Sequence, residues 1–308
     1  MKKYLVISAL FIGMLALNGC SIKSMAMYGV GDALSGGGGS VFSSDNDPDL
    51  IKDAIPFALK LNESILEGAP DHKGLILATA KNYCMYSYAF LQMEAEKEAA
   101  DNYAKSIELR QRAKNLFLRS RDYSLRGLEL NHPGFKEALK KDYKAAIAKT
   151  DKEDIGLLYW CGAAWVAALT ADKNDVQLMV DMPIGAAMVG RVLELDEAYD
   201  SGAAHAFFIS YDGGRSPAMG GSEKRAREHF AKAVEFSKGL DAGPYLSLAS
   251  ISISNQNVQE FKDLLGKCIA VDVDKNPDNR LANIIYQRRA KWMLEHLSDY
   301  FITEETKE

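Results

Sequence analysis

The sequence predicts an all-α fold, a divergent array of helical hairpins with about 11 helices. Three observations support this prediction. Apolar residues recur at helical spacing through almost all of residues 47–302, no segment alternates as strands do, and helix-ending phrases recur along the chain. Hydrophobic residues make up 47% of the chain, charged residues 26%, and the net charge is -5. This composition is typical of a soluble globular protein and implies no general nucleic-acid partner.

The apolar spacing places the helices in order along the chain. Pro48 suits the first turn of the first helix, which we expect Pro56 to kink. The third helix stops at Asn131-His132-Pro133-Gly134, because proline cannot continue it. The predicted helices lie near 48–65, 72–99, 101–130, 135–149, 153–171, 174–195, 199–210, 222–238, 243–255, 257–271 and 278–301.

The run IGLLYWCGAAWVAAL, residues 155–169, is the most apolar part of the chain after the N-terminus. It is shorter than the roughly 20 residues that cross a bilayer as a helix. Gly162 and the neighbouring alanines allow another helix to approach closely, while Trp160 and Trp165 supply bulk. We therefore expect a central buried helix.

The N-terminus has the layout of a secretory signal over residues 1–19: two lysines, an uncharged apolar run and a small residue before Cys20. Leu17-Asn18-Gly19-Cys20 resembles the lipobox of bacterial lipoproteins, although Asn18 departs from the commoner Ala or Ser. The resemblance implies cleavage before Cys20 and lipid attachment to it. Ser21, in place of Asp, favours the periplasmic side of the bacterial outer membrane, where the lipid would anchor the protein.

Residues 20–46 follow this signal and contain Gly36-Gly37-Gly38-Gly39-Ser40 with few core-forming residues. Such composition predicts a lipidated, flexible tether. We expect one helical-repeat domain over 47–302 and a disordered tail over 303–308.

Positive charge is concentrated between Lys105 and Lys149, where 12 Lys and Arg face 5 Asp and Glu. Two interpretations remain open: solvated helix faces, or a basic face for an acidic partner. In the second case Arg119, Arg121 and Lys140 are the candidate partner-binding residues.

The stretch YDGGRSPAMGGS, residues 211–222, offers a second candidate surface. Loops carry function more often than repeat helices do, so Asp212 and Arg215 are further candidates for partner binding. The alternative is a glycine-rich connection between two helices of one hairpin.

An apolar ligand cavity is a third hypothesis. Met179, Met182 and Met188 lie near Pro183, and methionine adapts to varied apolar shapes. Together with Trp160 and Trp165 they are candidate cavity residues for a lipid-like ligand; ordinary core packing is the alternative.

Nothing in the sequence indicates catalysis. The histidines have no metal-ligand spacing, and no nucleophile elbow is present. Cys84, Cys161 and Cys268 lie in apolar helical patterns and are interpreted as small buried hydrophobes. We predict neither an enzyme, nor a metal site, nor a cofactor.

The helix-ending phrases indicate repeats. The spacings between their first residues are 65, 41 and 35 residues, and the last two lie near the 34 of the tetratricopeptide repeat. Each phrase is expected to end the second helix of a hairpin, as in that repeat. The phrases are Leu128-Glu129-Leu130-Asn131, Leu193-Glu194-Leu195-Asp196, Val234-Glu235-Phe236-Ser237 and Ile269-Ala270-Val271-Asp272.

Four longer stretches resemble, in the same order, the T-component (TatT) family of TRAP transporters. They are residues 47–80, 220–239, 259–272 and 276–301, and the most specific pieces are Leu281-Ala282-Asn283, Gly220-Gly221-Ser222 and the motif QRRAKW at 287–292. The resemblance implies a periplasmic tetratricopeptide-like lipoprotein, a homotrimer, that associates with the solute-binding subunit of a tripartite ATP-independent transporter. It also implies an apolar cavity for hydrophobic ligands, and no catalytic residues.

The leading hypothesis is therefore a lipid-anchored accessory protein that docks the solute-binding protein of a TRAP transporter. Two alternatives remain open. One is a tetratricopeptide lipoprotein scaffold for outer-membrane assembly, and the other is a stand-alone carrier of hydrophobic ligands.

Overall fold

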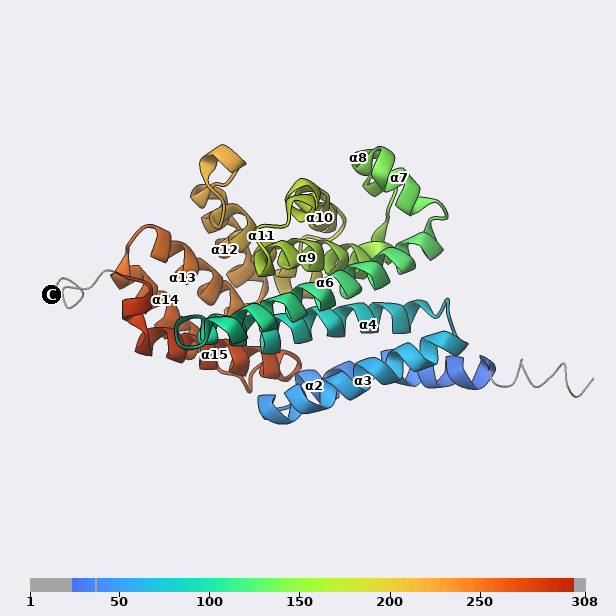
Figure 1. Cartoon of the computed structure of the whole chain (residues 1–308), viewed down its shortest axis with the longest axis horizontal. Coiled ribbons are helices and arrows are strands. Elements are labelled where there is room, and N and C mark those ends of the chain that lie inside the picture. Colours follow the sequence, from blue (N-terminus) through green and yellow to red (C-terminus); the bar gives the residue numbers. More distant parts are fainter. Residues whose placement is uncertain (1–23, 37, 302–308) are drawn as a thin grey trace, which may run out of the picture.

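The computed structural model describes residues 24–36 and 38–301, and within these ranges it contains helices and turns but no strand (Figure 1). The all-α prediction is confirmed. In chain order the elements are a helix over 24–36, α2 (Gly38–Ser43), α3 (Pro48–Gly68), α4 (Lys73–Tyr86), η1 (Ser87–Gln92), α5 (Met93–Asp101), α6 (Tyr103–Asn131), α7 (Phe135–Lys141), α8 (Tyr143–Ile147), η2 (Lys152–Asp154), α9 (Ile155–Ala171), α10 (Val176–Leu195), α11 (Tyr199–Gly213), η3 (Pro217–Met219), α12 (Glu223–Phe236), α13 (Gly243–Ser254), α14 (Val258–Ile269), η4 (Pro277–Asn279), α15 (Arg280–Glu295) and η5 (Leu297–Asp299).

Side-chain caps fix where several of these helices begin. Asp47 accepts hydrogen bonds from the amides of the first turn of α3, at 3.0 and 3.1 Å. Asp175 caps α10 at 3.0 Å, and Ser222 caps α12 at 3.3 Å. Each cap satisfies an amide that has no partner inside the helix, so these short polar residues set the start of each element.

Four helical hairpins form the body. α4 and α5 pack on α6, α9 on α10, α11 on α12, and α13 on α14, while α6 also packs on α9 and thereby joins the first two hairpins. The helix-ending phrases at 128–131, 193–196, 234–237 and 269–272 lie at the ends of α6, α10, α12 and α14. Each phrase thus ends the second helix of a pair, as predicted.

Helix α9 is the central buried helix that its composition predicts. It packs against α4, α6, α10 and α11. A Cβ atom on Gly162 would lie 2.3 Å from the carbonyl oxygen of Gly185, so only glycine permits this contact with α10. Residues 152–171 and 176–195 are long and apolar enough for membrane spans, but most of the first is buried within the protein. We therefore interpret α9 as a core helix.

Two hydrophobic clusters share α15. Leu281 and Ile285 belong to the larger cluster, built from α3 to α11, whereas Ala290 and Met293 belong to the smaller one, built from α11 to α15. The fully buried Asn283 holds the start of α15 in place. Its side-chain nitrogen donates to the backbone carbonyl of Leu240 at 2.9 Å, and its side-chain oxygen accepts from the backbone amide of Ala242 at 2.9 Å. The motif 281–283 is thus structural.

The predicted tether over 20–46 is wrong for its described part. Residues 24–36 form a helix, and α2 follows it. Met27 and Leu34 pack against the larger hydrophobic cluster, and the ring of Tyr28 stacks on that of His72 at 5.5 Å. Glycine content predicted flexibility, but these apolar contacts supply the stabilisation that local composition lacks. Cys20, the signal over 1–19 and the tail over 303–308 lie outside the described residues.

Three helix boundaries also differ from the prediction. The helix expected at 135–149 is divided into α7 and α8 at Asp142, which takes an extended backbone and caps α8 through a 3.1 Å hydrogen bond from Ala145. Helix α11 continues to Gly213, three residues beyond its expected end. Helix α3 continues through Pro56 to Gly68.

Candidate functional site

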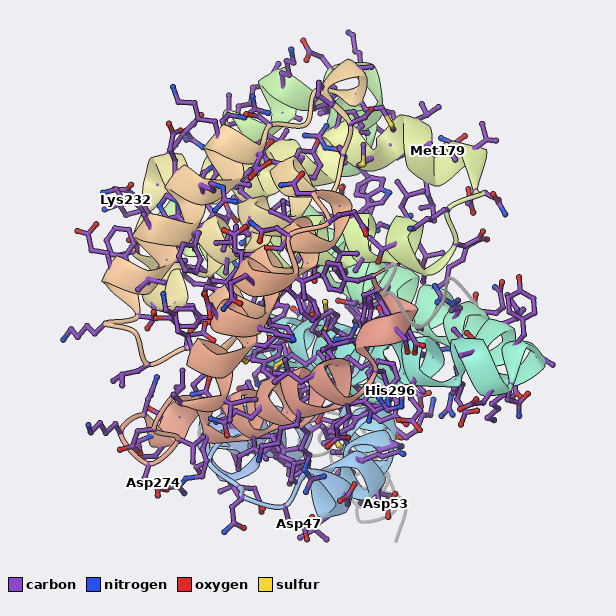
Figure 2. The ribbon with its side chains drawn as sticks, turned by 90° about the vertical axis from the view of Figure 1, so that its left-hand side faces the viewer. Asp47, Asp53, Met179, Lys232, Asp274 and His296 are labelled. Carbon is purple, nitrogen blue, oxygen red and sulfur yellow. The ribbon has the colours of Figure 1, made fainter. Side chains whose placement is uncertain are left out.

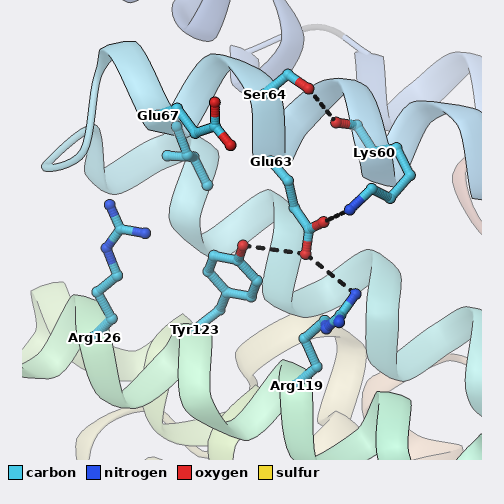
Figure 3. Close-up of a pocket in the computed structure, with 8 residues that line it drawn as sticks. Lys60, Glu63, Ser64, Glu67, Arg119, Tyr123 and Arg126 are labelled. Atoms are coloured by element: carbon cyan, nitrogen blue, oxygen red, sulfur yellow. Dashed lines mark hydrogen bonds and ion pairs between the residues drawn. The ribbon is translucent and has the colours of Figure 1, made fainter.

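A polar pocket lies between α3 and α6 (Figure 3). It encloses about 380 Å³, and charged side chains dominate its walls. Arg119, one of the residues predicted to bind a partner, is among them. The lining residues are Lys60, Glu63, Ser64, Leu66, Glu67, Arg119, Tyr123 and Arg126.

The Glu63 carboxylate is the centre of the hydrogen-bond network in this pocket. It accepts hydrogen bonds from the hydroxyls of Tyr83 and Tyr123, at 2.8 and 3.2 Å, and from the ammonium of Lys60. Arg119 approaches the same carboxylate to 3.5 Å. Although burial acts to raise the pKa of Glu63, hydrogen bonds from Lys60 and Tyr83 and the charge of Arg119 outweigh burial and lower it. The carboxylate is therefore ionised and its charge is balanced inside the protein.

Two tyrosines form the floor of this network. Burial raises the pKa of Tyr83 and of Tyr123 to about 12, so both hydroxyls stay protonated and act as donors. Their rings stack at 6.1 Å, and the guanidinium of Arg119 lies 5.4 Å from the ring centre of Tyr83. The pocket lining holds three basic side chains, Lys60, Arg119 and Arg126, against the two carboxylates Glu63 and Glu67, so the pocket is suited to a polar group.

The three basic residues selected from the sequence do not share one surface. Arg119 faces the pocket, whereas Arg121 lies over the ring of Trp165, at 5.0 Å, and pairs with Asp122 at 2.7 Å. Residues two positions apart on a helix point in different directions, which explains this separation. Lys140 lies on α7, where it pairs with Glu137 at 2.8 Å.

Lys140 belongs to an exposed group of lysines that reasoning from single residues missed. We call it the α7–α8 lysine cluster; all its members are exposed, and the acidic residues among them are Glu137 and Asp142. The spacing of lysines four residues apart along 136–144 was the available signal. Figure 1 shows α7 and α8 at an upper corner, away from α2 and α3 at the lower edge. The cluster comprises Lys136, Lys140, Lys141, Lys144 and Lys149.

The prediction that Asp212 meets a partner does not fit the structure. Its side chain is only 6% exposed and accepts hydrogen bonds from Arg225 at 2.8 and 3.1 Å and from Arg215 at 3.3 Å. Arg215 also stacks on the ring of Tyr211 at 3.7 Å. A buried carboxylate needs such partners, so this acidic residue closes the 211–222 turn from within.

The apolar cavity stays a prediction, and the five residues proposed to line it differ in burial. Met188 is fully buried and Trp165 is 7% exposed, so both serve as core. Met182 is partly buried, whereas Met179 exposes 42% of its surface on the outer face of α10. Trp160 instead meets the edge of the Tyr159 ring at 5.0 Å.

The cysteine prediction is confirmed. Cys84, Cys161 and Cys268 are buried free thiols, and burial raises the pKa of Cys84 and of Cys268 to about 12. They are therefore unreactive at neutral pH. In the part of the chain that the structure describes, no three or more His, Cys, Asp or Glu side chains are placed to hold a metal ion.

A family model described as TRAP transporter T-component matches residues 44–301. The match covers the helices from α3 to α15. This chain belongs to the TRAP transporter T-component family. A protein of Treponema pallidum (strain Nichols), described only as an uncharacterized protein, is 29% identical over 267 residues, which are 85% of this chain and 83% of that protein. Membership of the T-component family gives the chain an accessory role in a TRAP transporter; that it is not an enzyme stays a prediction.

Proposed function

We propose that this T-component is a lipid-anchored protein on the periplasmic side of the bacterial outer membrane, where it docks the solute-binding subunit of its TRAP transporter. The family match over 44–301 carries the proposal. A lipid on Cys20 would keep the helical body at the membrane surface, where the substrate-loaded partner diffuses.

The α7–α8 lysine cluster supports the docking half of the proposal. Its five lysines are exposed and only two acidic residues lie among them. Exposed charges of one sign attract an oppositely charged partner over about 8 Å at physiological salt and chiefly speed encounter. We therefore assign first contact with an acidic face of the solute-binding protein to this cluster, rather than to Arg119 and Arg121, whose charges are engaged within the chain.

Two finer parts of the proposal are a homotrimer and a bound apolar ligand. The homotrimer rests on the likeness to the T-component family. The apolar ligand is proposed beside the aromatic rings of Tyr159, Trp160 and Tyr199, which pack on one another. Sedimentation of the detergent-solubilised protein tests the trimer, and mass spectrometry of its organic extract tests the ligand.

Affinity purification from membranes of the native cells tests the function as a whole. The full-length tagged protein is cross-linked in the periplasm, and all captured proteins are identified. The proposal predicts enrichment of the solute-binding protein encoded with the transporter. Enrichment of barrel-assembly components without that protein would instead establish the scaffold alternative, and an apolar ligand with neither partner would establish the stand-alone carrier.

A further inference from the structure

We infer that α3 and the helix over 24–36 form the face with which this protein lies on the membrane surface, so that the body is held in one orientation. The inference rests on the proposed lipid at Cys20. It assigns a bilayer surface as the occupant of an exposed apolar face that no other element covers in the described structure.

Helix α3 carries an apolar stripe that points away from the body. Leu50, Phe57 and Leu61 are 58%, 74% and 39% exposed. Residues spaced by seven and eleven positions lie on the same side of a helix, and eleven residues extend about 17 Å along its axis. The opposite side of α3, with Ile51 and Leu59, is buried in the core. The three side chains therefore form one apolar row along the exposed side of α3.

The helix over 24–36 adds to the same edge of the molecule. Met25 exposes 71% of its surface and Val30 46%. In Figure 1 this helix and α2 lie beside α3 along the lower edge. Figure 2, turned by 90° about the vertical axis, labels Asp53 of α3 at the bottom and Met179 of α10 near the top, so the two apolar helices lie on opposite sides of the body.

Specific contacts fix the 24–36 helix to the turn between α3 and α4. The hydroxyl of Tyr28 donates to Asp71, and Nε2 of His72 lies 3.2 Å from Asp32. On the other side of the ring, Nδ1 of His72 accepts a hydrogen bond from the amide of Leu75 at 3.1 Å. Any substituent larger than hydrogen on Gly31 would meet the His72 ring, within 2.5 Å. The helix is thus docked closely.

The short distance to Cys20 decides which occupant fits. Three residues lie between Cys20 and Ser24, the first described helical residue. Even a fully extended chain spans at most about 14 Å over that length. A lipid on Cys20 therefore brings this edge, and no other, to the bilayer. The α7–α8 lysine cluster then faces the periplasm.

Lipid-borne quenching tests this orientation in the full-length protein. Phe57→Cys and Val180→Cys are each labelled with an environment-sensitive fluorophore and placed in phosphatidylethanolamine/phosphatidylglycerol vesicles. The native thiols stay unlabelled because they are buried. Val180 is a matched control, since it is apolar and 67% exposed but lies on α10. Mass spectrometry first establishes the lipid on Cys20.

Nitroxide-labelled lipids should quench about half of the fluorescence at position 57 and leave position 180 unchanged, because interfacial apolar groups sit about 5–10 Å below the headgroups. Equal quenching at both positions, or quenching at 180 alone, would overturn the inference. If the fluorophore at position 57 reports an apolar environment without lipid, and does so more strongly at higher protein concentration, the face binds a second copy of the chain. A free Cys20 thiol would also overturn the inference. Because the quenching assay contains no solute-binding protein, its result does not depend on whether the protein docks that partner.

Discussion

Asp154 joins the end of α6 to the start of α9. Its side chain is 1% exposed and accepts hydrogen bonds from Asn131 at 2.7 Å, His132 at 2.6 Å and the amide of Asp151 at 3.0 Å. Burial acts to raise the pKa of Asp154, but the hydrogen bonds from Asn131 and His132 lower it overall. The carboxylate is thus ionised and satisfied, and the Asn131-His132-Pro133-Gly134 stop acts as more than a break in the chain.

We predict that Asp154→Ala lowers the free energy of unfolding by about 2–3 kcal/mol, because it leaves several donors without an acceptor. Chemical denaturation monitored by circular dichroism measures the change. Glu153→Ala is the matched control: Glu153 is the exposed neighbouring carboxylate, and its loss should change stability by less than about 0.5 kcal/mol. Equal effects of the two variants would refute the role given to Asp154.

A pair of histidines packs between α11 and α12. Nδ1 of His205 lies 2.8 Å from Nδ1 of His229, so one ring must donate and the other must accept. Burial lowers the pKa of both histidines below the ordinary 6.5. Nearby carboxylates act in the opposite direction: Glu197 lies 3.3 Å from His205, and Asp212 lies 3.9 Å from His229. The positive charge of Lys232 adds to the lowering of the His205 pKa. Both rings therefore favour the neutral form in the folded protein.

Stability should fall as the pH falls through about 6.5, since the unfolded chain then binds protons that the folded pair resists. Denaturation midpoints between pH 7.5 and 5.5 measure the slope. His229→Gln should flatten it, because this variant removes one titrating ring and the repulsion between two protonated rings. A slope identical to that of the wild type would show that the pair does not control this pH dependence.

Residue patterns predicted these sites unevenly. Charge density singled out the 105–149 segment, whose role in partner binding stays a prediction, but a linear sequence does not show that Arg119 turns toward Glu63 and Arg121 toward Trp165. Asp212 begins a glycine-rich stretch that the sequence favours as a loop, yet only the fold reveals that it lies in the last turn of α11 and that Arg225 reaches it from α12. Burial and ion pairing depend on distant elements, and for that reason sequence reasoning missed them.

At the scale of elements, the close contact of α9 with α10 makes the sharpest prediction. Gly162→Ala places a Cβ atom 2.3 Å from a backbone oxygen that cannot move without shifting α10. We expect a loss of about 1–3 kcal/mol in unfolding free energy, as for other overpacked cores.

Gly190→Ala, on α10, provides the control. Its nearest neighbour would be the Phe208 ring at 4.0 Å, which is ordinary contact. Alanine favours helix over glycine by up to about 1 kcal/mol, so this variant should be neutral or more stable. Thermal denaturation of both variants tests the account, and a stable Gly162→Ala protein would mean that α9 and α10 are not held in close contact.

The elements themselves were largely predictable, because their stability depends on apolar periodicity that the sequence displays. Helices α3 to α15 fall where the spacing places them, and the interruption at Asp142 reflects a local cap that competed with continuation. The 24–36 helix was missed for the opposite reason. Its stabilisation comes from Met27 and Leu34 packing on a surface assembled by other helices.

At the scale of the whole molecule, α15 closes the array onto its own beginning. It packs against α2 and α3 as well as α13 and α14. Arg288 pairs with Asp49 at 2.9 Å, and Arg280 donates to the carbonyl of Ser44 at 2.9 Å. An open repeat array unfolds by pieces when neighbouring contacts weaken, but a closed one loses both hydrophobic clusters together.

We therefore predict a single cooperative unfolding transition. Trp160 and Trp165 report on the larger cluster and Trp292 on the smaller one. The variant Trp292→Phe leaves fluorescence from the larger cluster alone, and the double variant Trp160→Phe with Trp165→Phe leaves fluorescence from the smaller cluster alone. In each variant the midpoint of unfolding measured by fluorescence should coincide with the midpoint measured by circular dichroism. Separate midpoints in either protein would show that α15 does not couple the clusters.

The central claim is that this T-component docks a solute-binding protein through its α7–α8 lysine cluster. Its most direct test is the association rate of the full-length, detergent-solubilised protein with the cognate solute-binding protein, measured by stopped flow at several salt concentrations. Reversal of Lys136, Lys140 and Lys144 to Glu should slow association about tenfold at low salt and flatten its salt dependence. The same reversal of the exposed Lys224, Lys267 and Lys275, which changes the net charge equally, should have little effect. Equal slowing by both sets, or no association of the wild-type protein at tens of micromolar, would contradict the account.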